Sequence, residues 1–358
     1  MKCNLEITSS QSIYLDTSEF DRAFPPGKKR IVICDKNVVP AAREILPGEE
    51  LWISVKANEE LKTLEACARL LEEIAEMRIT KDFEMVAVGG GTVQDAVTLI
   101  ASLYMRGLAW VYVPTTLMSM MDSCIGGKSS INLGRYKNVI GNFYPPKAVY
   151  IDPRFALTLS PEDISCGVSE GAKICFAAST ESFEDFAEEI NKWRLTGTET
   201  DLLAAVFTAL EKKKWFIEID EFDRNERKLL NFGHSFGHAL EAASDFSFAH
   251  GIGVLIGMLA AIDLSGRKSA TKSLSSFISQ EISESKVTNR KYVIDRKVFL
   301  DALARDKKNS GQQQNLILPD SLGRLAVHAF PLDVDSLEKC WKSLTDALAE
   351  LGFTYEVL

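Results

Sequence analysis

The segment MVAVGGGTVQDAVTLIASLYMRG (85–107) decides the fold class of this chain. Its first four residues are apolar and read as a buried strand, three glycines follow, and apolar residues at helical spacing come after them. Glycines at such a turn let a diphosphate approach the backbone, and the helix N-terminus offers free N–H groups to the anion. The turn lacks the GxGxxG fingerprint, so a plain tight turn between strand and helix is the competing interpretation.

Strand-like and helix-like patterns alternate on both sides of this segment. Apolar strand patterns occur at 30–35, 50–56, 109–116 and 148–152. The segment 59–78 carries apolar positions at helical spacing, with charges on its other face. This alternation predicts a parallel sheet covered by helices. Thr115 and Thr116 end one strand at the edge where ligands bind in open α/β sheets.

From about residue 160 onward the patterns are mostly helical. Helices are predicted over 161–195, 199–218, 227–244, 251–266, 296–308 and 336–352, with a short strand at 315–319. The Ser/Lys-rich segment 268–293 is expected to be an exposed, partly mobile helix or loop. Because 358 residues exceed one ordinary core, we expect two domains. A nucleotide-binding α/β domain would span 1–155, and a mostly helical domain would span 156–358.

The composition is that of a globular enzyme, with 46% hydrophobic and 25% charged residues. The net charge of −9 argues against non-specific binding to nucleic acid or anionic membranes, but it allows a local basic pocket for a small anion. The seven cysteines are scattered without a CxxC pair, which fits reduced thiols. No segment resembles a signal peptide or approaches the roughly 18 apolar residues of a membrane span, so we expect a cytoplasmic protein.

Three of the four histidines fall in one short stretch, NFGHSFGHALEAASDFSFAHG (231–251). His234 and His238 are four residues apart and would share one face of a helix, towards which the segment carrying His250 could fold back. Imidazole is the commonest metal ligand and a proton shuttle near neutral pH, so the cluster suggests a site. Ordinary surface or core histidines are the alternative interpretation.

Glu170 and Lys173 are a charged pair inside an otherwise apolar stretch, VSEGAKIC (168–175). Such a pair is either a buried structural ion pair or part of a site. A carboxylate with two histidines is a common catalytic zinc set, so we group Glu170 with His234 and His250 and assign proton transfer to His238. In HSFGH, Ser235 stands where the HExxH zinc peptidases carry their catalytic base, which disfavours a peptidase.

The segment 121–146, MDSCIGGKSSINLGRYKNVIGNFYPP, is rich in glycine and polar residues. Its composition excludes a core helix. Asp122, Lys128, Lys137 and Asn138 lie within it, and the two lysines could converge on an anion. A solvated loop is the alternative.

Taken together, these motifs resemble the dehydroquinate synthase family of sugar phosphate cyclases. The matching pieces are GGGTVQD, YMRG, VPTTLMSMMDSCIGGKSSIN, YKNVIGNFYPP, CGVSEGAKI, and RKLLNFGHSFGHALE with HG at 250–251. They run in family order across roughly residues 55–260, and DKK at 306–308 extends the match. The resemblance implies a homodimeric enzyme with an N-terminal Rossmann-like domain that binds NAD and a C-terminal helical domain that binds metal.

Carried over position by position, the resemblance implies three groups of site residues. Zinc or cobalt would be held by Glu170, His234 and His250. NAD would be held by Asp35, Glu59, Lys62, Gly90, Gly91, Thr92, Asp95, Thr115, Thr116, Asp122, Lys137 and Thr158. The substrate would be contacted by Lys128, Asn138, Lys173, Lys213, Arg227, Asn231 and His238, with Arg106 reaching it from the neighbouring subunit.

The activity that the resemblance implies is conversion of 3-deoxy-D-arabino-heptulosonate 7-phosphate into 3-dehydroquinate and phosphate. The metal would polarise a ring hydroxyl while NAD transiently oxidises it. Elimination of phosphate, re-reduction and an intramolecular aldol closure would follow. NAD is regenerated, so the enzyme would be a carbon–oxygen lyase of aromatic amino acid biosynthesis, the shikimate pathway.

The sequence departs from the family pattern at four positions. Asn58 replaces a usual glycine, Asp223 a usual glutamate, Ile252 the glutamate after His-Gly, and Asn315 a basic phosphate contact. These changes leave open a related cyclase that acts on sedoheptulose 7-phosphate or glucose 6-phosphate. Valiolone-type cyclases typically carry Asp and Pro where this chain has Asn231 and His238, and deoxy-inosose synthases carry Glu at the first position. The two residues therefore favour the heptulosonate substrate.

Two interpretations lie outside the cyclases. A metal-dependent NAD alcohol or glycerol dehydrogenase would share the broad architecture, but its unphosphorylated substrates give no reason for the lysine and arginine set. A catalytically inactive NAD- or metal-binding regulator is disfavoured by the intact Glu/His/His and lysine set.

Overall fold

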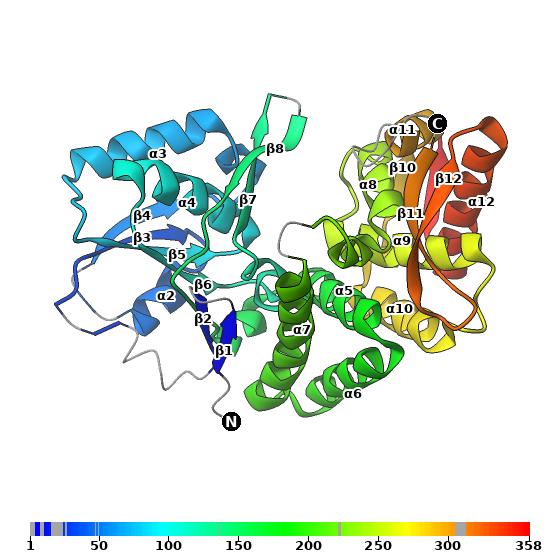
Figure 1. Cartoon of the computed structure of the whole chain (residues 1–358), viewed down its shortest axis with the longest axis horizontal. Helices are drawn as coiled ribbons and strands as arrows, with labels where there is room; N and C mark the ends of the chain where they lie inside the picture. Colours follow the sequence, from blue (N-terminus) through cyan, green and yellow to red (C-terminus); the bar gives the residue numbers. More distant parts are fainter. Residues whose placement is uncertain are drawn as a thin grey trace. The chain divides into compact units, whose positions relative to one another are not determined.

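A computed structural model describes the chain except for residues 1–3, 8–10, 16–23, 26, 47, 49, 135, 221–222 and 305–312. It comprises two compact units, Met1–Leu159 and Ser160–Leu358 (Figure 1). The predicted fold class is confirmed: an α/β part with a parallel sheet precedes a mostly helical part.

Unit 1 is built on a seven-stranded sheet with the order β1-β2-β9-β6-β5-β3-β4. Strand β1 (Asn4–Ile7) runs antiparallel to β2 (Gln11–Tyr14), and every other neighbouring pair is parallel. The parallel partners are β9 (Ala148–Tyr150), β6 (Trp110–Pro114), β5 (Glu84–Gly89), β3 (Arg30–Asp35) and β4 (Leu51–Val55). Strands β5 and β6 are buried along their whole length, which explains why they are apolar runs rather than alternating patterns. Strands β1 and β2 were not predicted.

The helices of unit 1 cover both faces of this sheet. The chain steps outward from β3 to β4 through α2 (Val39–Ile45), then inward through α3 (Leu64–Glu76) to β5 and through α4 (Gly91–Leu103) to β6. Because such crossovers are right-handed, α3 and α4 share one face and α2 lies on the other (Figure 1). The predicted helix over 59–78 is a 3-10 turn, η3 (Glu59–Leu61), followed by α3, whose first turn Thr63 caps.

The segment 121–146 is a β-hairpin rather than a solvated loop. Strands β7 (Lys128–Leu133) and β8 (Tyr136–Phe143) pair antiparallel, after a short helical turn, η5 (Ser119–Ser123). Gly141 is required there, since a Cβ at this position would lie 1.9 Å from the carbonyl oxygen of Ser129. The turns η4 (Tyr104–Arg106) and η6 (Pro153–Thr158) complete the unit.

Unit 2 is formed mainly by helices. They are α5 (Pro161–Ala178), α6 (Thr180–Thr196), α7 (Glu199–Ile219), η7 (Glu226–Asn231), α8 (His234–Ala243), α9 (His250–Ser265), α10 (Lys272–Ser285), η8 (Val287–Asn289), α11 (Arg296–Ala304) and α12 (Val334–Glu350). Two small sheets accompany them, one of the parallel strands β10 (Lys291–Ile294) and β13 (Thr354–Val357), the other of the antiparallel strands β11 (Gln313–Pro319) and β12 (Leu325–Pro331). Helix α9 is buried on all sides and packs against α5, α8 and α12.

Three expectations for unit 2 need refinement or correction. The helical stretch expected over 161–195 is two helices, because Ser179 ends α5 and caps α6 by accepting a hydrogen bond from the backbone of Ser182. The stretch expected over 227–244 is the turn η7 followed by α8, with Gly233 between them at a positive φ of 79°. The segment 268–293, expected to be exposed, contains the core-packed helix α10. Its Leu274, Phe277 and Ile278 are buried at helical spacing.

Within the described residues, no helix has both the length and the apolar composition that crossing a membrane would need.

Candidate metal and nucleotide site

The glycine turn of unit 1 lies at the carboxyl edge of the parallel sheet. Gly90 precedes α4 without any side-chain cap on the helix, and its carbonyl accepts from the backbone N–H groups of Val93 and Gln94. A Cβ on Gly90 would lie 2.9 Å from Cγ2 of Thr116, the residue that follows β6. The glycine therefore allows the ends of two neighbouring strands to approach each other and leaves the first turn of α4 accessible to an anion.

Other residues predicted to bind the nucleotide lie along the same edge. Asp35 ends β3, Gly90 follows β5 and Thr115 follows β6, and these three strands are adjacent and parallel. Parallel strands end at one edge of a sheet, so the fold brings these residues to one side. The Asp35 carboxylate accepts a hydrogen bond from the backbone of Asn37 at 3.1 Å.

Lys62, Asp95 and Asn138 form one polar network between the hairpin and the helices. The Lys62 Nζ lies 2.8 Å from Oδ2 of Asp95 and donates to Oδ1 of Asn138 at 3.0 Å. The other Asp95 oxygen accepts from the backbone of Ser130 at 3.0 Å. Burial raises the pKa of Asp95, and Lys62 opposes that shift. Lys62 and Asp95 were predicted to bind NAD, and Asn138 to contact the substrate. Lys62 joins all three into one network in unit 1.

The remaining predicted residues of unit 1 are spread over several elements. The Thr158 hydroxyl donates to the carbonyl of Phe155 at 2.8 Å, within η6. Arg106 lies in an exposed turn with a positive φ of 64°. The others occupy the start of α4 (Thr92), η3 (Glu59, bonded to Asn132 at 2.9 Å), η5 (Asp122), the first residue of β7 (Lys128) and β8 (Lys137).

In unit 2 the three clustered histidines come together. The ring of His234 lies 5.2 Å from that of His238 and 5.3 Å from that of His250, measured between centroids. One nitrogen of each imidazole lies within 4.8 Å of the others, so the three side chains could hold a metal ion.

Glycines on α8 and α9 allow this approach. A Cβ on Gly257 would lie 2.1 Å from the carbonyl oxygen of Gly233, and one on Gly237 would lie 2.9 Å from that of Gly253. The two helices therefore touch backbone to backbone, which places the first residue of α9, His250, beside the histidine face of α8.

Glu170 projects from α5 into the same cluster. Its side chain is only 2% exposed, and its Oε1 lies 3.8 Å from Nε2 of His234 and 3.5 Å from Nε2 of His250. That oxygen has no hydrogen-bond partner, whereas Oε2 is bonded to Nζ of Lys173. Zinc bonds to oxygen and nitrogen are about 2.0–2.2 Å long, so ligand atoms separated by about 3–4 Å can share one ion.

The cluster thus offers two possible sets of three metal ligands. Both sets contain His234 and His250, and the third ligand is either Glu170 or His238. We favour the set with Glu170, because its carboxylate compensates a cation, is buried, and has an oxygen that lacks a partner. His238 is exposed, which suits transfer of a proton to a bound molecule better.

The ionisable groups of this cluster are strongly perturbed. Burial alone would raise the pKa of Glu170, but the Lys173 ammonium and the charged His250 imidazole hold it well below its ordinary value. Burial and Lys173 lower the pKa of His234, which keeps that imidazole neutral and ready to bind a metal. Burial also disfavours the charged form of His250, yet Glu170 and Glu241 together raise its pKa to about 10 in the metal-free cluster. A metal ion bound at Nε2 would have to displace the proton from that nitrogen, so binding would release a proton.

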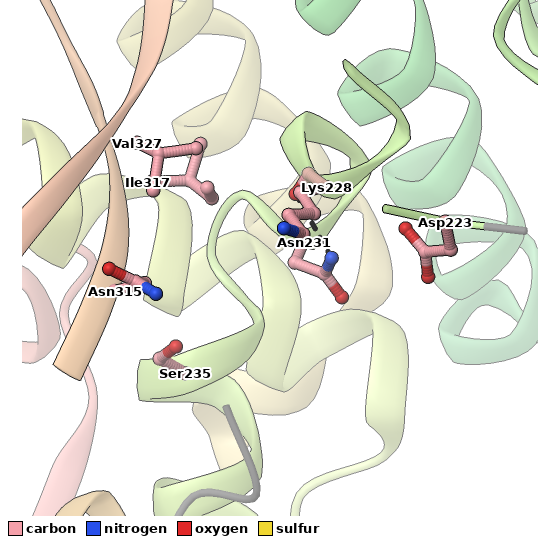
Figure 2. A pocket seen from close by; sticks show the side chains of 7 residues that line it. All are labelled: Asp223, Lys228, Asn231, Ser235, Asn315, Ile317 and Val327. Carbon is pink, nitrogen blue, oxygen red and sulfur yellow. Dashed lines mark hydrogen bonds between the residues drawn. The ribbon is translucent and has the colours of Figure 1, made fainter. Parts of the chain in front are cut away.

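A cavity of about 390 Å³ lies in unit 2 beside the histidine-bearing helix. Figure 2 shows Asn315, Ile317 and Val327 on the β11–β12 side and residues of η7 and α8 opposite them. Its lining residues are Asp223, Lys228, Asn231, Ser235, Asn315, Ile317 and Val327. Asn231 and Ser235 flank His234 in the chain. The cavity thus gathers one predicted substrate residue, Asn231, and two of the positions that depart from the family pattern, Asp223 and Asn315.

Comparison with known sequences decides the family. The model described as 3-dehydroquinate synthase N-terminal matches residues 52–166, and the model described as 3-dehydroquinate synthase C-terminal matches residues 167–309. The chain belongs to the 3-dehydroquinate synthase family.

Its relatives include enzymes named 3-dehydroquinate synthase. The one from Caldanaerobacter subterraneus subsp. tengcongensis is 32% identical over 89% of this chain and 93% of its own length. The one from Sulfolobus acidocaldarius is 33% identical over 84% of this chain and 88% of its own length.

Solved structures share the fold of this family member. A 2-deoxy-scyllo-inosose synthase, complexed with carbaglucose-6-phosphate, NAD+ and Co2+, has a TM-score of 0.82 at 21% identity and covers 97% of this chain and 100% of its own. The 2-epi-5-epi-valiolone synthase from Streptomyces hygroscopicus subsp. jinggangensis, with NAD+ and Zn2+ bound, has a TM-score of 0.80 at 23% identity, covering 98% and 99%. A glycerol dehydrogenase from Schizosaccharomyces pombe has a TM-score of 0.63 at 15% identity, covering 99% and 94%.

Several residues of this family member's site were not singled out from the sequence. Asp220 accepts from the backbone N–H groups of Arg224, Asn225 and Arg227, at 2.9, 2.7 and 3.2 Å, and so shapes the loop that carries the buried Arg227. Glu241, seven residues after His234 and three after His238, contacts His250. Because Glu241 is spaced on α8 so as to share the face of His234 and His238, its place in the cluster could have been predicted from the sequence. Ile317 and Val327, by contrast, reach the cavity only because β11 pairs with β12.

Proposed function

We propose that this chain is a 3-dehydroquinate synthase, a carbon–oxygen lyase that converts 3-deoxy-D-arabino-heptulosonate 7-phosphate into 3-dehydroquinate and phosphate. Family membership and relatives of that name support this assignment. The observation that carries it is the partnerless, buried oxygen of Glu170, which faces an imidazole nitrogen of His234 and one of His250. A buried anionic oxygen without a hydrogen-bond donor is energetically costly, and a divalent cation bound to it would compensate its charge.

Glu170, His234 and His250 would hold zinc or cobalt in unit 2. NAD would bind unit 1 at the carboxyl edge of the sheet, where Gly90 and Gly91 open the first turn of α4. The other NAD residues would be Asp35, Glu59, Lys62, Thr92, Asp95, Thr115, Thr116, Asp122, Lys137 and Thr158. When bound, NAD would accept and return a hydride, and the metal would polarise the hydroxyl that is oxidised.

The substrate's negative groups require cations, and unit 2 supplies them in buried positions. Lys173, Lys213 and Arg227 are 3%, 6% and 6% exposed. Cations held in such low-dielectric surroundings attract carboxylate and phosphate more strongly than surface lysines do. Asn231, together with Lys128 and Asn138 of unit 1, would bind hydroxyl and phosphate oxygens, and His238 would hold the proton that is transferred.

Two finer assignments belong to the same proposal. The enzyme would act as a homodimer in which Arg106 reaches the neighbouring subunit's substrate, and the exposed turn that carries Arg106 supports this role. It would work in the cytoplasm, because its described cysteines are all buried free thiols, as expected of a reducing compartment.

The decisive experiment incubates the purified, zinc-loaded protein with NAD and 3-deoxy-D-arabino-heptulosonate 7-phosphate. We expect phosphate release without net accumulation of NADH, and 3-dehydroquinate as the product by NMR. Sedoheptulose 7-phosphate and glucose 6-phosphate serve as competing substrates, and turnover of either one in place of the heptulosonate would identify another cyclase. Accumulation of NADH with an unphosphorylated alcohol would instead identify a dehydrogenase.

The Lys173→Ala variant tests where the substrate binds. We expect it to keep its zinc, because the metal compensates Glu170 once the lysine is gone, but to lose turnover. Near-normal turnover in this variant would show that the substrate does not bind beside Lys173.

A further inference from the structure

We propose that Glu241 is a positioning residue that orients the imidazole of His250 for the metal. The inference rests on the proposed metal site and adds a residue that neither the sequence motifs nor the comparisons assign. It concerns which nitrogen of His250 faces the ion, and therefore how tightly the site binds metal.

The hydrogen bond between Glu241 and His250 fixes the orientation of the ring. Nδ1 of His250 lies 2.8 Å from Oε1 of Glu241, while Nε2 lies on the other side of the ring, 3.5 Å from Oε1 of Glu170. A carboxylate that accepts a hydrogen bond from Nδ1–H selects the tautomer whose Nε2 lone pair is available to a metal. Glu241 thus determines which nitrogen points towards Glu170.

The position of Glu241 follows from the helix that carries it. His234, His238 and Glu241 are spaced four and three residues apart on α8, so their side chains project from one face. The backbone of Glu241 also closes the turn that leads to α9, because its carbonyl accepts from the N–H of Phe246 at 2.7 Å and from the hydroxyl of Ser244 at 3.2 Å. One residue therefore anchors both the start of the connection to His250 and the His250 ring itself.

No carboxylate on α9 performs this function in the described structure. The residue two positions after His250 is Ile252, an apolar residue whose side chain is fully buried. Among the described residues, the carboxylates that contact His250 are those of Glu170 and Glu241. Glu170 faces the nitrogen that would bind the ion, so orientation of the ring depends on Glu241.

Loss of a carboxylate that orients a metal-binding histidine typically lowers metal affinity about 10–100-fold. We expect a loss in this range for Glu241→Ala, measured as zinc affinity by competition with a chromogenic chelator. Glu241→Gln should lose less affinity, because its amide oxygen can still accept a hydrogen bond from Nδ1–H of His250. Asp245→Asn is the matched control. It removes one negative charge from an exposed position on the same turn, and Asn tolerates the positive φ of 50° found there.

A spectroscopic measurement separates orientation from general destabilisation. The visible spectrum of the Co2+-loaded protein reports the ligands around the ion. We expect its bands to shift in both Glu241 variants and to stay unchanged in Asp245→Asn. If Glu241→Ala does not fold, the zinc affinity and cobalt spectrum of Glu241→Gln decide the question, and wild-type values for both would overturn the proposal.

Failure of the metal site itself would look different. Glu170→Gln and His234→Ala should abolish zinc binding if the proposed site is right. Should both variants retain zinc, the proposed function loses its metal site and the role of Glu241 falls with it. Should they lose zinc while Glu241→Ala binds it within about twofold of the wild type, the metal site stands and Glu241 has no part in it.

Discussion

The carboxyl edge of the sheet in unit 1 and the histidine cluster of unit 2 differ in how their charges are satisfied. In unit 1 the side chains are partnered by the protein itself, as in the pair of Lys62 and Asp95, and access for an anion comes from the backbone at Gly90. In unit 2 a buried carboxylate oxygen of Glu170 has no donor. The first region is suited to binding by shape and backbone dipoles, the second to binding a cation.

The largest effect expected from this contrast is that of Glu170→Gln. The substitution removes the anionic oxygen from the cluster and leaves the buried Lys173 ammonium without its partner. Breaking a buried ion pair from one side costs about 3–5 kcal/mol of unfolding free energy. We expect such a loss in urea unfolding of the zinc-free protein, together with loss of zinc binding.

A second substitution separates these two effects. In Glu170→Gln/Lys173→Met the uncompensated cation is gone, so stability should return towards that of the wild type while zinc binding stays lost. Zinc binding by either variant would contradict the assignment of Glu170 as a ligand.

The next largest effect tests the backbone character of unit 1. Gly90→Ala places a Cβ 2.9 Å from Cγ2 of Thr116, although the φ of −80° suits alanine. Overpacking of this kind costs about 1–3 kcal/mol. We expect NAD affinity, measured by calorimetry, to fall about tenfold, which corresponds to about 1.4 kcal/mol. Zinc content should not change.

Gly91→Ala is the comparison variant. Gly91 is itself assigned to the nucleotide site, but its Cβ would meet nothing nearer than Oγ of Ser123 at 3.7 Å, so this variant should lose less NAD affinity than Gly90→Ala. Thr116→Ser removes the Cγ2 atom with which the Cβ of Gly90→Ala would clash. Adding Thr116→Ser to Gly90→Ala should therefore restore much of the NAD affinity. Equal losses in the two alanine variants would show that close approach of the strand ends is not what the glycine provides.

The sequence predicted the sheet of unit 1 well and the details of both sites less well. Strands such as β5 and β6 are continuous apolar runs, so their burial could be read directly. The hairpin of β7 and β8 was missed because its strands are polar and form a two-stranded sheet separate from the main one. Helix α10 was assigned to the surface because serines on its outer face dilute the pattern of Leu274, Phe277 and Ile278.

The candidate site was predictable where residue chemistry is scarce and specific. Four histidines, three of them close together, mark a site in the sequence alone. Glu170 lies more than 60 positions before them, and its grouping with them rested on a common zinc ligand pattern. The apolar wall of the cavity at Ile317 and Val327 could not be foreseen, because only the pairing of β11 with β12 brings it there.

Another buried carboxylate of unit 2, that of Glu281, extends the contrast to stability. Glu281 is fully buried, and burial raises its pKa from 4.5 to about 7 despite the ion pair with Arg194 at 2.7 Å. The folded state then binds a proton more tightly than the unfolded state does. The contribution of Glu281 to the stability of the folded state is therefore largest below pH 4.5, and this contribution falls as the pH rises towards 7.

We expect the fall due to Glu281 to reach about 3 kcal/mol at most, since each pKa unit corresponds to about 1.4 kcal/mol. Urea unfolding between pH 5 and 8 should show it in the wild type and a flatter profile in Glu281→Gln. Glu284→Gln, which removes the exposed carboxylate bound to the same Arg194 at 3.2 Å, should keep the wild-type slope. Parallel profiles for wild type and Glu281→Gln would contradict the raised pKa.

The smallest expected effect concerns an exposed charge at the cavity of unit 2. Lys228 lines the cavity but is solvent-exposed, unlike the buried Lys173. Exposed ion pairs contribute about 1 kcal/mol or less, so Lys228→Ala should raise the KM for the phosphorylated substrate by no more than about fivefold and leave kcat nearly unchanged. Lys272→Ala, at an exposed position on α10, is the control and should alter neither constant. A fall in kcat alongside the rise in KM would mean that Lys228 contacts the reacting part of the substrate. It would contradict the distinction between buried cations, which bind the substrate directly, and exposed cations, which only attract it.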